Sequence, residues 1–162
     1  SVPDSGGVVF VPALTGLGAP DWDPHARGTI LGINRGTTRA HLVRATLEAI
    51  AFEVQDVVEL MVREGNVSVP ELAVDGGASA NGLLCQLQAD ALGVPVARAA
   101  VLETTGMGAA FLAGLATGVW ASEDEIAAVV HRDARFEPGE HDENGHRRWR
   151  AAVERSKNWA VL

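Results

Sequence analysis

Apolar residues that recur at helical spacing mark residues 40–64 as the clearest helix of the chain. Charged side chains fill the positions between them, which gives this segment one apolar and one polar face. Thr38 is placed to cap the start of the helix, and Gly65 with Asn66 to stop it. The apolar positions are Val43, Leu47, Ile50, Val54, Val58 and Met61.

Four short apolar runs bounded by glycine or proline predict β-strands. They lie at residues 8–12, 28–33, 72–74 and 94–97. Further helices are expected after Ser79, over residues 105–117 and after Ser122, where Glu125 completes a capping box. Strands that alternate with helices predict an α/β fold with a partly parallel sheet.

The whole chain, residues 1–162, is expected to form one unit. Its α/β body spans residues 7–130, and the strongly acidic balance of this part gives way to a slightly basic one afterwards. Residues 131–145 are rich in charge and contain the sequence Phe-Glu-Pro-Gly at 136–139, which predicts a mobile loop. A C-terminal helix over residues 146–160 follows. Its apolar face is formed by Trp149, Ala152, Val153, Ser156 and Trp159.

Composition excludes several classes of function. The chain has 162 residues, 47% of them hydrophobic, and a formal net charge of −8. An acidic protein of this size is a poor partner for nucleic acid or for anionic lipid. No apolar run approaches the roughly 18 residues of a membrane span, and the start resembles no signal peptide. A cytoplasmic protein without nucleic-acid or membrane partners is therefore expected.

Rare residue types narrow the chemistry further. The single lysine, Lys157, lies outside any glycine-rich turn, so a P-loop is excluded. The single cysteine, Cys85, excludes an internal disulfide and a cysteine-based zinc cluster. Ser79 and Cys85 have no neighbouring histidine, so no hydrolase triad is predicted. Cys85 is interpreted as a small buried hydrophobe.

The sequence Asp-Gly-Gly-Ala-Ser-Ala-Asn at residues 75–81 is the most informative candidate site. Paired glycines between a strand and a helix let the backbone of Gly76, Gly77 and Ala78 approach a ligand. The start of a helix also offers free N–H groups to a phosphate. Asn81 adds an amide that can bond a base or a sugar. A tight turn without a ligand remains the alternative.

A second glycine cluster runs from Thr104 to Gly114, and close helix packing explains it better than a ligand does. Three aspartates, Asp21, Asp23 and Asp75, are candidate acid–base carboxylates. None has a partner in the sequence that identifies it as a general base, so structural roles are favoured for all three.

Three histidines near the C-terminus suggest a metal site, because Asp142 and Glu143 lie among them. The histidines are His131, His141 and His146. No pair of them has the spacing of a helical zinc site. A solvated polar loop is the preferred interpretation, and no metal ligand is assigned.

Three stretches of this chain resemble the FGGY family of carbohydrate kinases. They are residues 11–28, residues 28–33 together with 41–48, and the Asp-Gly-Gly-Ala of residues 75–78. The similarity extends from about Gly7 to Trp159, and the first stretch is most similar to the branch that phosphorylates glycerol. The resemblance implies an actin-like ATPase, ribonuclease H-like fold, of which this chain is the later part of the C-terminal, ATP-side domain.

The family resemblance also implies roles for particular residues. In similar kinases the second glycine of the Asp-Gly-Gly turn and the asparagine four residues later contact the nucleotide. These correspond to Gly77 and Asn81, with Gly76 and Ala78 as weaker candidates. The implied ligands are ATP or ADP and Mg²⁺. In the enzymes of this family the ion is held mainly through ATP and through their N-terminal part.

The chain lacks other parts of the family's machinery. The general base of the family lies in an Asp-Gln-Gln segment, and this chain has none. It also lacks the residues that hold glycerol, so no catalytic or glycerol-binding residue is assigned. The expected function is that of the nucleotide-binding portion of a homo-oligomeric kinase that phosphorylates glycerol, inactive alone. The alternatives are another sugar or polyol kinase of the family, or a non-catalytic nucleotide-binding or interaction module.

Overall fold

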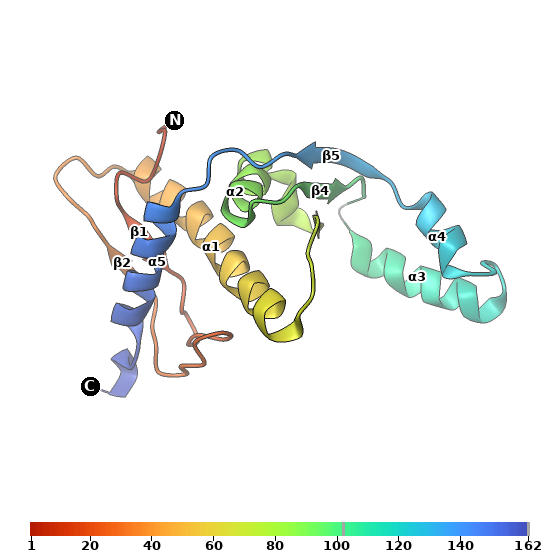
Figure 1. Ribbon diagram of the computed structural model, residues 1–162, viewed down its shortest axis with the longest axis horizontal. Helices are drawn as coiled ribbons and strands as arrows, with labels where there is room; N and C mark the ends of the chain where they lie inside the picture. The colour runs from red at the N-terminus through yellow and green to blue at the C-terminus, as the bar shows by residue number, and fades with distance from the viewer. Residues whose placement is uncertain (102, 162) are drawn as a thin grey trace.

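The computed structural model describes residues 1–101 and 103–161 (Figure 1). Its N-terminal part is a two-stranded antiparallel sheet of β1 (Val9–Val11) and β2 (Thr29–Leu31). Two helices, α1 (Arg39–Gly65) and α5 (Glu143–Ser156), pack against β1. Residues far apart in sequence therefore pack together in one hydrophobic core. Its buried members are Val11, Ala13, Ala26, Ala49, Trp149, Ala152 and Val153.

A second sheet contains β3 (Leu72–Val74), β4 (Val96–Ala99) and β5 (Arg132–Phe136) in that order. β3 and β4 are parallel, whereas β5 runs antiparallel to β4. Helix α2 (Gly82–Leu92) packs on α1 and on β4. The α/β fold with a partly parallel sheet is thus confirmed. A small core joins this layer, with Cys85, Ala89 and Val96 fully buried.

Helices α3 (Thr104–Thr117) and α4 (Glu123–Val129) extend from the far end of this second sheet (Figure 1). Phe111 packs edge-on against Trp120 and holds the two helices' connection together. Leu112 and Val119 are each 70% exposed. The apolar composition of α3 is therefore not explained by burial within the described residues.

The helix over residues 40–64 is confirmed as α1, which ends at Asn66 in the left-handed conformation (φ 48°). The four predicted strands and the helix over residues 105–117 are also confirmed, with shifted ends. No helix in residues 1–101 and 103–161 is both long and apolar enough to cross a membrane.

The C-terminal part differs from the expectation. The predicted loop of residues 131–145 contains β5 and the first turn of α5, which begins at Glu143. This charged segment pairs antiparallel with β4, with Ala134 and Phe136 half-buried and its other side chains exposed. Trp159 does not share the apolar face of α5, because the helix ends at Ser156. It lies in the 3₁₀ turn η2 (Trp159–Val161) and is 61% exposed.

Candidate functional site

The Asp-Gly-Gly turn follows the carboxyl end of β3. The register pairs Leu72 with Val96 and Val74 with Arg98, so β3 and β4 end at the same edge of the sheet. Ligands of open α/β proteins bind outside the carboxyl ends of parallel strands. The fold therefore presents the turn at the edge where a ligand is expected.

The two glycines of the turn have different local requirements. Gly76 has φ 79° and ψ 168°, a conformation that side-chain-bearing residues rarely adopt. Gly77 has no such φ and begins the 3₁₀ turn η1 (Gly77–Ala80). A Cβ added at either glycine would meet no atom within 4 Å. The surface of the turn is therefore open, and neither backbone strain nor packing in the described chain explains Gly77.

Asn81 connects this turn to α2. Its side-chain Oδ1 accepts hydrogen bonds from the N–H groups of Leu83 (3.1 Å) and Leu84 (3.4 Å), so it caps the helix. Among the described residues its Nδ2 group makes no hydrogen bond, which leaves a donor at the open turn. The cap is a local reason for an asparagine here, but aspartate or serine would cap equally well.

Ser79 and Cys85 stabilise the turn from beneath. The Ser79 hydroxyl donates to the Gly76 carbonyl (2.7 Å), and the Ser79 carbonyl accepts from Cys85 Sγ (3.2 Å). Arg98 donates to the same carbonyl at 3.3 Å. Cys85 is fully buried, and burial raises the pKa of its thiol. The side chains of Ser79 and Cys85 thus hold the backbone of the turn in place, and neither exposes a reactive group.

The structure brings the second glycine cluster to the first. Thr104, at the start of α3, donates its hydroxyl to Asp75 Oδ2. Gly106 and Gly108 follow in the first turns of α3, and a Cβ at either would meet nothing within 4 Å. The contact joins residues 29 positions apart, so no local pattern in the sequence indicates that the two clusters meet.

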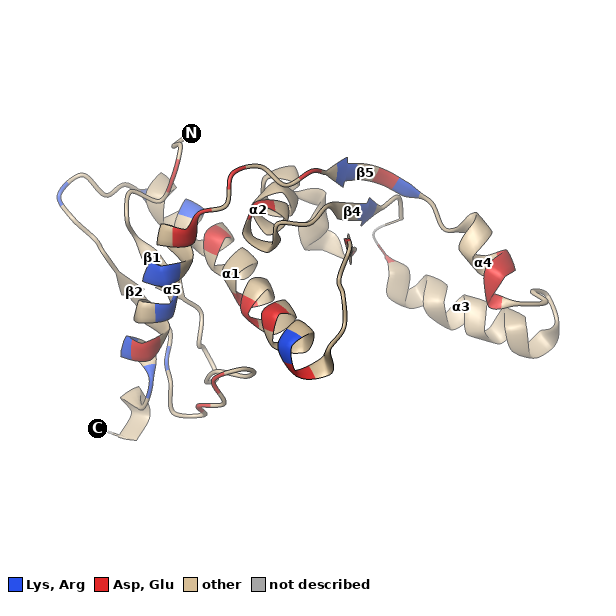
Figure 2. Cartoon of the chain, viewed as in Figure 1, with Lys and Arg blue, Asp and Glu red and all other residues tan. Residues whose placement is uncertain are grey.

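The other two candidate aspartates lie away from this turn. Asp21 accepts hydrogen bonds from Arg150 (2.9 and 3.0 Å) and pairs with Lys157 (2.8 Å). Asp23 accepts from the backbone N–H of Asn158 at 2.7 Å. Figure 2 shows basic residues along α5 and acidic residues along α1. These aspartates therefore fix the C-terminal segment to the loop that follows β1.

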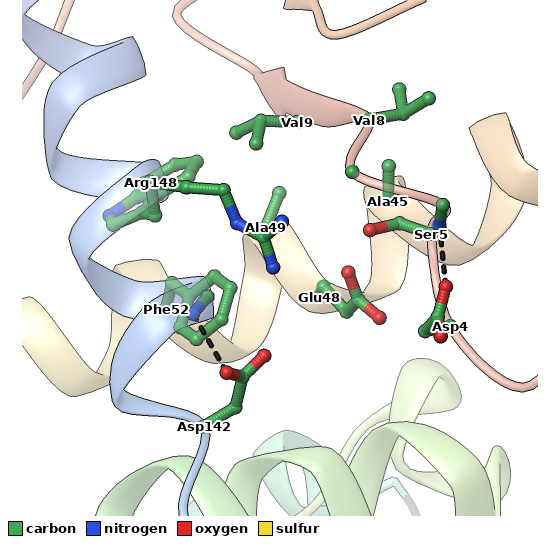
Figure 3. A pocket seen from close by; sticks show the side chains of 14 residues that line it. Asp4, Ser5, Val8, Val9, Ala45, Glu48, Ala49, Phe52, Asp142 and Arg148 are labelled. Atoms are coloured by element: carbon green, nitrogen blue, oxygen red, sulfur yellow. Dashed lines mark hydrogen bonds between the residues drawn. The ribbon is translucent and has the colours of Figure 1, made fainter.

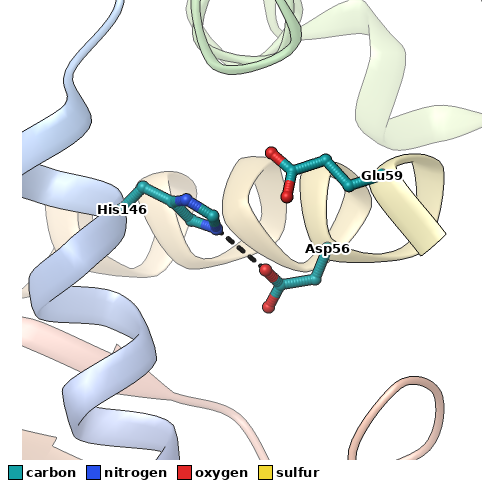
Figure 4. A group of neighbouring side chains, drawn as sticks. All are labelled: Asp56, Glu59 and His146. Atoms are coloured by element: carbon teal, nitrogen blue, oxygen red, sulfur yellow. Dashed lines mark hydrogen bonds and ion pairs between the residues drawn. The ribbon is translucent and has the colours of Figure 1, made fainter. Parts of the chain in front are cut away.

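His146 is not part of a solvated loop, which corrects the expectation. It lies in the first turn of α5 and donates from Nε2 to Asp56 Oδ1 of α1 at 2.8 Å (Figure 4). Ligand atoms of His146, Asp56 and Glu59 all lie within 4.8 Å of one another. Gln55 donates to Glu59 at 2.6 Å and lies 3.4 Å from His146 Nδ1. Hydrogen bonds among these side chains account for their proximity and tie α1 to α5.

The remaining two histidines do not join this group. His141 lies on the surface with Nδ1 3.2 Å from the carbonyl of Asp90. His131 immediately precedes β5 and is exposed. The three histidines are thus in three different environments.

Asp21 and Asp56 have lowered pKa values. Burial favours the neutral carboxyl of Asp56, but the side-chain hydrogen bonds that it accepts outweigh burial and lower its pKa. Burial of Asp21 is likewise outweighed by Arg150 and Lys157. Both carboxylates are therefore ionised at neutral pH and stabilise the fold as anions.

Acid is expected to destabilise the protein through these two carboxylates. A group whose pKa is lower in the folded state stabilises it above the unfolded pKa and loses that contribution as pH falls through the folded pKa. Urea unfolding should be measured from neutral pH to about pH 2.5. The free energy of unfolding should fall as the pH drops below 3.8, the ordinary pKa of an aspartate. Asp21→Asn should flatten this acid limb, and an unchanged limb would contradict the assignment.

Glu53 supplies a control of opposite sign. Burial and the charge of Asp56 raise the pKa of Glu53. Its contribution to stability is therefore present below its ordinary value of 4.5 and is lost as pH rises through the raised pKa. Glu53→Gln should remove that loss and leave the acid limb from Asp21 in place.

A cavity of about 160 Å³ lies elsewhere, between residues 4–9, α1 and the start of α5. Figure 3 shows Arg148 reaching across it between α5 and α1, with Glu48 and Asp142 among its polar lining. Neither Gly77 nor Asn81 borders it. The candidate nucleotide surface is thus an open turn at the sheet edge, and it lies outside this cavity.

Comparison with known proteins defines the class. Residues 1–117 match the family model described as "FGGY family of carbohydrate kinases, C-terminal domain". The fold is accordingly part of an actin-like ATPase, ribonuclease H-like domain. This chain belongs to the FGGY family of carbohydrate kinases.

Curated relatives are similar over almost the entire chain. It is 55% identical to a glycerol kinase of Oleidesulfovibrio alaskensis, with 99% of this chain and 33% of the relative aligned. It is 56% identical to glycerol kinase 2 of Thermotoga maritima, with 98% and 32% aligned. The chain therefore spans about a third of the length of the curated relatives it matches.

Solved structures show the same relationship. The crystal structure of Plasmodium falciparum glycerol kinase with ADP matches at a TM-score of 0.82 and 34% identity, over 96% of this chain and 32% of that one. A ligand-bound xylulose kinase from Lactobacillus acidophilus matches at 0.71 and 25% identity, over 94% and 30%.

Proposed function

We propose that this chain is the nucleotide-binding portion of a glycerol kinase, which transfers the γ-phosphoryl group of ATP to glycerol and gives glycerol 3-phosphate. The observation that carries the proposal is the open Asp-Gly-Gly turn, where Gly77 has room above it and Asn81 has a spare amide donor. The identity to curated glycerol kinases and the similarity to a structure with ADP support it.

The turn can position a nucleotide without covalent chemistry. The first N–H groups of a helical turn have no partner within it, so Gly77 and Ala78 can donate to an anionic or polar ligand. Asn81 Nδ2 can donate to the sugar or base while Oδ1 keeps α2 capped. Phosphoryl transfer depends mainly on such positioning and on charge stabilisation.

Mg²⁺ is not assigned to residues of the turn. This ion requires nearly octahedral oxygen coordination. Asp75 is the one carboxylate of residues 75–81, and its Oδ2 already accepts the Thr104 hydroxyl. We therefore place Mg²⁺ on the nucleotide phosphates and on the rest of the protein. Homo-oligomer formation and a cytoplasmic location are further proposals that rest on the family resemblance.

Two substitutions test the nucleotide site. Gly77→Ala and Asn81→Asp should each raise the KM for ATP about tenfold while the KM for glycerol stays within about twofold. Gly77→Ala places a methyl group in open space where the nucleotide lies, and Asn81→Asp keeps the helix cap but removes the donor. The kinetics use a chimaera in which this chain replaces the corresponding third of the Thermotoga enzyme. Calorimetric titration of ADP into the chain alone is the second readout.

The controls separate binding from folding. Gly18→Ala also places a Cβ where no atom lies within 4 Å, but in the loop between β1 and β2. Asn34→Asp alters an asparagine whose Oδ1 accepts from a backbone N–H, as that of Asn81 does. Neither control should change ATP kinetics. Unchanged KM for ATP and unchanged ADP affinity in both site variants would overturn the proposal.

A different sugar or polyol is the second candidate substrate, because xylulose and gluconate kinases also match this fold at 25% identity. The higher identity to glycerol kinases favours glycerol. Phosphorylation of glycerol, xylulose and gluconate by the whole protein that contains this chain would separate these substrates.

A further inference from the structure

The edge of the second sheet brings the two glycine clusters into one place. β3 leads into Asp75 and the open turn, and parallel β4 leads towards Thr104 and α3. The Thr104 hydroxyl donates to Asp75 Oδ2 and so connects the segments that leave the two strands. The nucleotide contacts that the family resemblance implies fall on residues 76–78 and 81, and they include neither the Asp75 nor the Thr104 side chain.

This contact is the hydrogen bond that attaches α3 to the turn. Within the described residues, the other side-chain hydrogen bond of α3 is that of Thr117, whose hydroxyl donates to carbonyls of the same helix. Backbone hydrogen bonds at the end of α3 join Gly118 and its neighbours to α3 itself. The position of the first turn of α3 relative to Gly76 therefore depends on Asp75 and Thr104.

The turn needs such an anchor because two adjacent glycines leave its backbone free to adopt many conformations. Ser79 fixes the later side of the turn by donating to the Gly76 carbonyl at 2.7 Å. Asp75 is fixed on the earlier side by Thr104.

We propose that Asp75 and Thr104 are positioning residues, whose hydrogen bond holds the Gly76–Gly77 turn in its nucleotide-binding conformation and couples that turn to α3. This inference rests on the proposed function. The inference adds two residues that act through the turn, and it makes the start of α3 part of the nucleotide-binding unit. Ordering the turn before binding lowers the entropy cost of binding the nucleotide.

Thr104→Val, which removes the hydroxyl at nearly constant shape, is the main test. In the chimaera it should raise the KM for ATP about fivefold, with kcat and the KM for glycerol within about twofold. Thr104→Ser keeps the donor and should restore the KM. Asp75→Ala should raise the KM similarly, and the double variant should be no worse than either single one because they remove the same bond.

Thr117→Val is the matched control, since its hydroxyl bonds only within α3. It should leave the KM for ATP unchanged. The same series is measured by calorimetric ADP titration of the chain alone, so an inactive chimaera does not prevent the test. If the contact only stabilises the fold, Thr104→Val will lower the free energy of unfolding without changing the KM for ATP or the affinity for ADP. That result would overturn the inference.

The two proposals fail in distinguishable ways. The positioning role alone would be overturned if Thr104→Val and Asp75→Ala kept normal ATP kinetics and ADP affinity. In that case the other two variants, Gly77→Ala and Asn81→Asp, would still show clear defects. Normal behaviour of all four variants would overturn both the positioning role and the nucleotide site. Additive losses in the double variant would show that the two residues act separately and would also overturn the inference.

Discussion

Asp56→Ala is expected to lower the free energy of unfolding by about 3 kcal/mol. The Asp56 carboxylate accepts hydrogen bonds of 2.8 Å from His146, from Trp149 Nε1 and from Arg150. It is 9% exposed, so water replaces few of these bonds. Removal leaves a buried indole N–H without an acceptor. Arg150 keeps Asp21 as a partner, which limits the loss.

The loss is measured by urea unfolding at neutral pH, followed by far-ultraviolet circular dichroism. Glu64→Ala is the matched control, because Glu64 lies on the same helix and pairs with Arg63 where both side chains are about two-thirds exposed. An exposed pair contributes little, so this variant should stay within about 0.5 kcal/mol of the original protein. A loss in Asp56→Ala no larger than that in Glu64→Ala would contradict a structural role for the network.

Local patterns predicted α1 and the Asp-Gly-Gly turn well. The apolar period of α1 extends over many turns, and the stop at Asn66 has the left-handed conformation typical of a helix end. Gly76 needs φ 79°, which paired glycines after a short apolar strand allow. These features depend on neighbouring residues, so the sequence carries them without knowledge of distant contacts.

Strand β5 could not be predicted in this way because its stability comes from distant partners. Arg132 and Arg135 both pair with Glu71, and Asp133 pairs with Arg98 of β4. In sequence these charges resemble a solvated loop, since their partners lie more than 30 residues away. Phe136, opposite Val96, contributes to the small second core. Burial at this position was not visible from composition.

The role of His146 was missed for a related reason, although one local signal was present. Asp142 Oδ1 accepts the N–H of Gly145 at 2.8 Å and so caps α5. That spacing indicates a helix start before His146, which the charge-rich composition concealed. The partner Asp56 is 90 residues away, however, and only the packed fold brings the two together.

Trp149→Ala is expected to cost about 4 kcal/mol, the range found when a large aromatic side chain is removed from a core. Trp149 is 1% exposed and is the largest fully buried side chain among the described residues. Its ring lies 6.1 Å from that of Phe52, and it packs in the core with Val11 and Val153. The substitution therefore removes apolar contact, leaves a cavity and deprives Asp56 of a donor.

Trp149→Phe separates the hydrogen bond from the packing, because it keeps an aromatic ring and removes the N–H. It should cost about 1–2 kcal/mol, at most half the loss in Trp149→Ala. The double variant Trp149→Phe with Asp56→Ala should lose about 1 kcal/mol less free energy of unfolding than the two single variants together. The reason is that both substitutions break the same hydrogen bond. Urea unfolding of the four proteins measures this coupling. Additive losses would mean that burial of the ring, and not its bond to Asp56, joins α5 to α1.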